Sequence, residues 1–309
     1  MLLNPIINST AYKVIKKDKE EGKLSHAYLI ICQDEAMLDS YMVEFAKLIA
    51  TNGSFEDIRT CTLIEKKIHP DVSFYPDGKK LNAANADEVI ANSIVRPLEL
   101  EKRIFVLEKI EDLAQYQNKL LKTIEEPPKN VHLLMGTVRE NAVLPTVKSR
   151  SKKLTIPLFS EEELFEALKG ECEDTEKLKL AISLSGGKAG EALRYYEMPN
   201  ASELFDYSVR VMRDMNKASD ILSFANKMKG FSVSDVISTL KLVCGKIVES
   251  EKFREENGII IRSAIVIRVV ERLSKIEKSV NFNANATMVI DGILFAVMEE
   301  KARWQRLSV

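Results

Sequence analysis

The chain has 309 residues, of which 45% are hydrophobic and 29% are charged, and these values are typical of a folded protein rather than a disordered one. This length exceeds what one ordinary hydrophobic core organises, so two or three domains are expected. The net charge of −1 argues against a protein that coats nucleic acid by itself, because such proteins are usually distinctly basic.

The four cysteines are widely scattered, and none has a second cysteine or a histidine at the spacing of a metal site. We therefore expect reduced, buried thiols and no bound metal. The first residues, MLLNPIINSTAYK, lack the basic and apolar regions of a signal peptide. No apolar stretch approaches the ~20 residues that span a bilayer. The sequence thus predicts a cytoplasmic protein without membrane contact.

The first half of the chain alternates short apolar segments with helical ones. The segments that we interpret as strands are residues 28–32, 71–75, 103–107, 131–135 and 153–156. Helices are expected from about residue 35 to 50, over 86–93 and over 113–126. This order predicts a mainly parallel sheet built from right-handed crossovers. His132 lies inside an apolar strand and is expected to be a core histidine with a hydrogen-bond partner.

The strand pattern ends at Pro157. Ser160 and the acidic residues 161–163 are typical of a helix N-terminus. Further helices are predicted at about 205–228, 232–248, 258–278 and 286–304. We therefore divide the chain into a parallel-sheet domain (1–158), a small helical domain (159–204) and an all-α domain (205–309).

The turn after the first strand, CQDEAMLDS, lies where α/β proteins usually carry a phosphate-binding loop. Such a loop needs glycines, so that backbone N–H groups can face a phosphate, and a lysine. Gln33, Asp34 and Glu35 stand here instead. Even at an effective dielectric of ~20, one pair of like charges at 4 Å costs about 4 kcal/mol. The turn therefore predicts that no nucleotide binds, and we interpret its adjacent carboxylates as exposed charge.

Residues 118–151 read NKLLKTIEEPPKNVHLLMGTVRENAVLPTVKSRS: a helix, a Pro-Pro stop, a buried strand ending at Thr137, and a loop closed by Ser149 and Arg150. This order resembles the AAA+ modules of replication clamp loaders, whose helix reads close to NALLKTLEEPP and whose loop ends in LPTIxSRC. Further pieces in the family's order are LSHAYLI (24–30), HPDV (69–72), RIFVLEKIEDL (103–113), LSGGKAGEAL (184–193) and NFNANATMVIDGILFAV (281–297). The resemblance spans nearly the whole chain. It implies an AAA+, P-loop NTPase-like sheet domain, a small helical lid and a helical collar.

The resemblance also implies that three parts of an ATP site are degraded. The phosphate loop is missing. Leu107, which ends the strand that resembles Walker B, is followed by Glu108 and Lys109 rather than by a run of metal-binding carboxylates. Gly190 aligns with the sensor 2 arginine of active subunits, and Thr137 matches sensor 1. Only Cys61 remains of a four-cysteine zinc module found in many relatives, so no zinc is expected.

Ser149 and Arg150 are the retained part of the site. In clamp loaders, the arginine of the SRC motif enters the ATP site of a neighbouring subunit, where its constant charge and planar fork suit a phosphate. The resemblance implies that Arg150 is such an arginine finger in trans. A chain with a degenerate site of its own and a retained finger is similar to the δ′ subunits of bacterial DNA polymerase III, although Ser151 replaces the cysteine of the motif.

The resemblance thus implies a non-catalytic subunit of the clamp loader. Its partners would be the γ/τ and δ subunits, with the sliding clamp and primed DNA reached through the complex. Two alternatives stay open. One is an independent AAA+ ATPase with an atypical phosphate loop. The other is δ, the clamp-opening subunit, although δ normally lacks the SRC arginine that this chain has.

Overall fold

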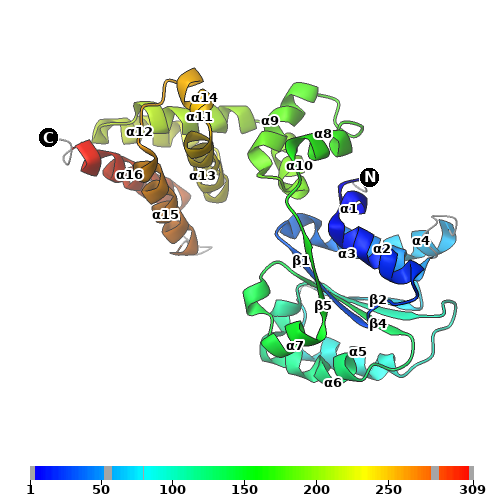
Figure 1. The fold of residues 1–309 in the computed structure, drawn as a ribbon. Helices are drawn as coiled ribbons and strands as arrows, with labels where there is room; N and C mark the ends of the chain where they lie inside the picture. The colour runs from blue at the N-terminus through cyan, green and yellow to red at the C-terminus, as the bar shows by residue number, and fades with distance from the viewer. Residues whose placement is uncertain (1–3, 52–57, 79, 280–284, 306–309) are drawn as a thin grey trace. The chain divides into compact units, whose positions relative to one another are not determined.

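The structure, a computed structural model, describes residues 4–51, 58–78, 80–279 and 285–305. The chain divides into two compact units, Met1–Arg194 and Tyr195–Val309, and each is described by itself (Figure 1). The separate lid at 159–204 stays a prediction.

The first unit is built on a five-stranded sheet in which every strand pair is parallel, in the order β2-β3-β4-β1-β5. The strands are β1 (Ala27–Cys32), β2 (Val72–Tyr75), β3 (Arg103–Leu107), β4 (Val131–Thr137) and β5 (Lys152–Ile156). Every residue of β3 and β4 is buried, because helices cover both faces of the sheet. The prediction of a parallel sheet is confirmed.

Two groups of helices sandwich this sheet (Figure 1). One face carries α1 (Asn4–Asn8), α2 (Thr10–Glu20), α3 (Leu38–Ala50) and α4 (Ile58–Glu65), with the 3₁₀ turn η1 (Glu35–Met37) before α3. The other face carries α5 (Ala83–Ser93), η2 (Ile110–Leu120), α6 (Leu121–Glu125) and α7 (Pro145–Arg150), with η3 (Glu140–Ala142) before α7. The helix predicted at 113–126 is wrong in part. Its first half is the 3₁₀ segment η2, which is kinked at Ala114 with φ 46°.

Three helices follow β5: α8 (Glu161–Leu168), α9 (Thr175–Ser185) and α10 (Ala189–Glu197). Ser160 caps α8 as predicted: its Oγ accepts the Glu163 N–H at 3.1 Å, and the Glu163 carboxylate accepts the Ser160 N–H at 2.9 Å. Gly187 has φ +82° between α9 and α10, a backbone conformation that favours glycine.

The second unit is helical throughout its described residues. It comprises α11 (Ala201–Asp214), α12 (Ala218–Met228), α13 (Val233–Glu249), α14 (Glu251–Glu256), α15 (Ser263–Ser279) and α16 (Ala286–Gln305). The single helix predicted at 205–228 is wrong, because the chain turns extended at Met215 and divides it into α11 and α12. The helix predicted to begin at 258 begins at Ser263. One apolar cluster, which includes Leu240 and Val266, joins these helices.

Candidate functional site

The turn that follows β1 holds Asp34 inside the protein. Asp34 is only 6% exposed, whereas its neighbours Gln33 and Glu35 are exposed. The prediction that both carboxylates of the turn are exposed charge is therefore wrong for Asp34. The Cys32 Sγ lies 3.4 Å from both the backbone N and O of Asp34, and these contacts fold the turn back on the end of β1.

Asp34 binds the N-terminus of helix α10. Its Oδ2 accepts the Gly190 N–H at 2.8 Å, across 156 residues of sequence. Helix N-termini have unsatisfied N–H groups and a positive dipole end, so a carboxylate is stabilised there. Burial raises the pKa of Asp34 above its ordinary value, although the Gly190 N–H and Lys188 oppose this shift.

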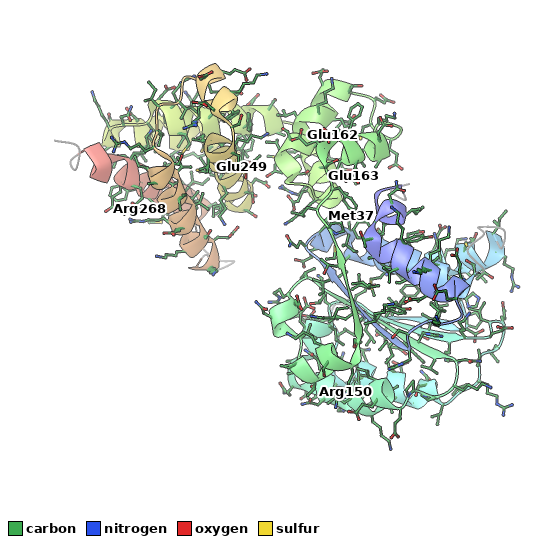
Figure 2. The ribbon with its side chains drawn as sticks, viewed as in Figure 1. Met37, Arg150, Glu162, Glu163, Glu249 and Arg268 are labelled. Atoms are coloured by element: carbon green, nitrogen blue, oxygen red, sulfur yellow. The ribbon has the colours of Figure 1, made fainter. Side chains whose placement is uncertain are left out.

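Position 190 has no space for a side chain. A Cβ built on Gly190 would lie 2.7 Å from both the Ala36 Cβ and the Asp34 Oδ1, and 3.2 Å from the Met37 Cγ. Figure 2 shows Met37 at the base of helices α8 and α10. The arginine that active relatives carry at the aligned position therefore does not fit this packing.

Three further carboxylates at the carboxyl edge of the sheet are paired with lysines of the same chain. Lys67 Nζ lies 2.5 Å from the Asp39 carboxylate of α3 and 3.1 Å from Glu108, which follows β3. Lys109 Nζ lies 2.7 Å from Glu35. These two ammonium groups are the counterions of three carboxylates, in the region where an active site would place a polyphosphate and its metal ion.

Asp39 and Glu108 influence each other's protonation. Burial and the nearby Asp39 carboxyl raise the pKa of Glu108 to about 7. Although burial opposes the change, hydrogen bonds from Glu108 and Lys67 hold the pKa of Asp39 below its ordinary value. Glu108 is thus partly protonated at neutral pH, which lowers the negative charge that this edge presents.

Thr137, which the resemblance matches to sensor 1, ends β4 and is fully buried. Its Oγ1 accepts the Arg139 N–H at 3.1 Å, and the next amide, that of Val138, donates to the Glu111 carboxylate at 3.1 Å. Both contacts shape the turn after the strand. The Thr137 hydroxyl is therefore engaged in the chain's own backbone.

Arg150 lies at the other edge of the sheet. It is the last residue of α7, and β5 begins two residues later, so it stands at the amino ends of the parallel strands. Figure 2 shows Arg150 on the side of the sheet part away from Met37, which lies beside the helix that carries Glu162 and Glu163. The two features that the sequence singles out, the degenerate turn and the retained arginine, therefore lie on different surfaces.

The guanidinium of Arg150 is accessible and oriented. Its side chain is 39% exposed and forms an ion pair with Glu125, at the end of α6. One terminal nitrogen also donates to the Thr146 carbonyl and the Ser149 Oγ, each at 3.2 Å. The Ser149 Oγ in turn donates to the Thr146 carbonyl at 3.1 Å. These contacts hold the fork in place while leaving part of it free for an anion.

The sequence analysis missed Lys67 and Asp39. Lys67 is separated from Asp39 by 28 residues and from Glu108 by 41, and its φ of 55° is unusual for lysine. No local pattern signals such a pairing. The cysteines, by contrast, are all buried as predicted, and none forms a disulfide. His132 is buried with its Nδ1 2.9 Å from the Ser25 carbonyl, also as predicted.

Two observations on metals and membranes apply to the described residues. No group of three or more His, Cys, Asp or Glu side chains there could hold a metal ion. No helix among those residues is both long and apolar enough to cross a bilayer.

Comparisons with known proteins agree with the architecture. A sequence model of the family described as "DNA polymerase III, delta subunit" matches residues 7–160. DNA polymerase III subunit gamma of Buchnera aphidicola subsp. Schizaphis graminum is 24% identical over 251 residues, covering 75% of this chain and 66% of that relative. DNA polymerase III subunit delta' of Bacillus subtilis is 28% identical over 158 residues, covering 49% of this chain and 47% of that relative.

A solved structure of a DNA polymerase III gamma subunit-related protein from Thermotoga maritima is 17% identical, with a TM-score of 0.48, and the match covers 94% of this chain and 99% of that one. The chain spans between about half and two thirds of the length of the two curated relatives. Its first unit has the parallel sheet between two groups of helices, and its second unit is helical in its described residues. Residues 7–160 therefore belong to the family of DNA polymerase III delta subunits, and the chain as a whole is similar to DNA polymerase III subunits.

Proposed function

We propose that this chain is a non-catalytic, δ′-type subunit of the clamp loader, which helps to place the sliding clamp on primed DNA. It contributes Arg150 to the ATP site of a neighbouring γ/τ subunit, and δ is a further partner. The chain itself hydrolyses no ATP, so the chemistry occurs in the neighbours.

One observation carries this proposal: the chain's own nucleotide site is filled by its own side chains, whereas Arg150 stays accessible. Asp34 is bound to Gly190, and three further carboxylates of that edge are bound to Lys67 and Lys109. A polyphosphate would have to break these contacts and face the carboxylates without their lysines. Each like-charge pair would then cost about 4 kcal/mol at an effective dielectric of ~20.

The contacts of Arg150 also suit a group that acts on another subunit. Glu125, its partner, is 45% exposed, so the ion pair is solvated and contributes little to folding, about 0–1 kcal/mol. A phosphate can therefore replace Glu125 at small cost. Arginine fingers supplied in trans increase hydrolysis ~10³–10⁵-fold in well-studied NTPases.

The test is to reconstitute the loader from cognate subunits with the Arg150→Ala chain and to measure DNA-dependent ATPase and clamp loading. Hydrolysis at the adjacent site should fall, and loading should fall with it. Arg59→Ala is the matched control, because Arg59 is also an exposed arginine in an ion pair, with Glu99 on the same unit. Unchanged rates with Arg150→Ala, or an equal loss with Arg59→Ala, would refute the trans role.

The two alternatives make different predictions. An independent ATPase would bind a fluorescent ATP analogue at micromolar concentrations in the isolated chain, and we expect no saturable binding. A δ-type subunit would bind and open the sliding clamp when isolated. Retention of Ser149 and Arg150 favours the δ′-type assignment over δ.

A further inference from the structure

A basic cavity lies at the amino edge of the sheet, the edge that also carries Arg150. Its volume is about 400 Å³. The described residues that line it include Lys19, Lys102, Lys129, His26 and His132, and they include no carboxylate. Arg150 is not part of this lining. The cavity is therefore independent of the proposed trans arginine.

The fold gathers these residues from distant parts of the sequence. In the sheet, β3, β4 and β1 are neighbours and run parallel, so their amino ends meet. Lys102 directly precedes β3, Lys129 stands two residues before β4, and His26 directly precedes β1. Lys19 comes from the last turn of α2. Four separate elements thus direct basic groups to one cavity.

The charges in this cavity lack counterions. Within the part of the chain that the structure describes, no ion pair involves Lys19, Lys102 or Lys129. Lys19 Nζ donates to the Leu48 carbonyl at 2.6 Å, which fixes its ammonium without neutralising it. Burial and the neighbouring Lys102 lower the pKa of Lys19 to about 8. The lysines therefore repel each other, and an anion between them would relieve this repulsion.

His132 adds a buried, directed group. It is 92% buried, since its exposed fraction is 8%. Its Nδ1 lies 2.9 Å from the Ser25 carbonyl, which can only accept, so Nδ1 carries the proton and Nε2 is the second, basic nitrogen. Burial lowers the pKa of His132, and Lys102 and His26 lower it further. A bound anion would offset the repulsion from Lys102 and His26, and would thereby raise the pKa of His132 and favour a protonated Nε2.

We propose that this cavity binds a phosphate group. Three ammonium groups match a multiply charged anion better than a single carboxylate, and lysine is a common point-charge ligand of phosphate. The volume lies within the range of small-ligand pockets. The phosphate belongs either to a small free ligand, for which pyrophosphate is the probe, or to the backbone of single-stranded DNA.

The test uses the full chain at low salt with two probes, pyrophosphate in calorimetry and a labelled oligothymidylate in fluorescence anisotropy. Lys102→Ala and Lys129→Ala should each weaken binding by about ten- to a hundredfold, as expected for loss of one hydrogen bond to a charged group. Lys16→Ala is the control, because Lys16 is an exposed lysine on α2 outside the cavity. Thermal melting confirms that each variant folds.

The probes distinguish the sources of the phosphate. Binding of both probes, with competition between them, indicates a pocket for a free phosphate ligand, and binding of the oligonucleotide alone indicates the DNA backbone. In addition, calorimetry near pH 8 in buffers of different ionisation enthalpy should detect proton uptake on binding, because an anion raises the pKa of Lys19. No binding of either probe, or equal affinities for the lysine variants and Lys16→Ala, overturns the proposal.

Discussion

The contact between Asp34 and Gly190 predicts a specific effect of adding one methyl group at position 190. In Gly190→Ala, the new Cβ would lie 2.7 Å from both the Ala36 Cβ and the Asp34 Oδ1, closer than any ordinary contact. Overpacking of this kind costs about 1–3 kcal/mol. If Asp34 moves away, a hydrogen bond to a charged acceptor is lost as well, at about 1.5–3 kcal/mol.

These two costs overlap and do not simply add. We therefore expect the free energy of opening helix α10 to fall by about 2–4 kcal/mol. Hydrogen exchange of the α10 amides should then accelerate roughly thirtyfold to a thousandfold, since every 1.4 kcal/mol is tenfold. The control is Gly170→Ala, because Gly170 has open space around its Cβ position and no positive φ. That variant should be neutral or stabilising by about 0.4–1 kcal/mol.

Unchanged hydrogen exchange of α10 in Gly190→Ala, or an equal change in both variants, would contradict this prediction. Either result would mean that the turn after β1 does not hold α10 in place. A larger side chain, including the arginine of active relatives, could then be accommodated there.

Three further predictions concern protonation and buried groups. The pKa of Glu108 is raised to about 7 in the folded chain, so folding favours the protonated carboxyl. The stability that this proton contributes is fully present below the ordinary pKa of ~4.3 and is lost as the pH rises through 7. Thermal melts from pH 5 to 8 should therefore show a smaller loss of stability in Glu108→Gln than in the wild type. Asp71→Asn should lower the free energy of unfolding by about 1–3 kcal/mol in urea titrations, because the Asp71 carboxylate accepts three backbone N–H groups. Burial raises the pKa of Cys32 to about 11 and of Cys244 to about 12, so thiol reagents at pH 8 should label both slowly in the native chain and rapidly in urea.

Each of these predictions has a contrary outcome. If the melting temperatures of the wild type and Glu108→Gln fall in parallel between pH 5 and 8, Glu108 is not the titrating group. An Asp71→Asn chain as stable as the wild type would mean that the amides of residues 98–100 find other acceptors. Rapid native labelling would place the two thiols at the surface.

The strands could be predicted from the sequence because a parallel sheet covered on both faces needs continuous apolar segments. Residues 103–107 are an example, since the predicted strand and β3 coincide. The kink at Ala114 could not be predicted, because a positive φ is uncommon for alanine and nothing in the neighbouring sequence signals it. The break at Met215 likewise carries no glycine or proline signal.

The candidate site was predictable only in part, for a physical reason. That no phosphate loop could form follows from the missing glycines and the carboxylates at positions 34 and 35, which are local features. The burial of Asp34 depends on Gly190, 156 residues away, and the ion pair of Glu108 depends on Lys67, 41 residues away. Such long-range pairings leave no pattern in a single sequence.

Single-turnover ATP hydrolysis in the reconstituted loader tests the central claim most directly. We predict that Arg150→Ala slows the chemical step at the adjacent ATP site while nucleotide affinity changes little, because the arginine acts mainly on charge that develops during hydrolysis. Arg150→Lys should recover only part of the rate, since lysine lacks the planar fork. Equal single-turnover rates for the wild type and Arg150→Ala would contradict the account.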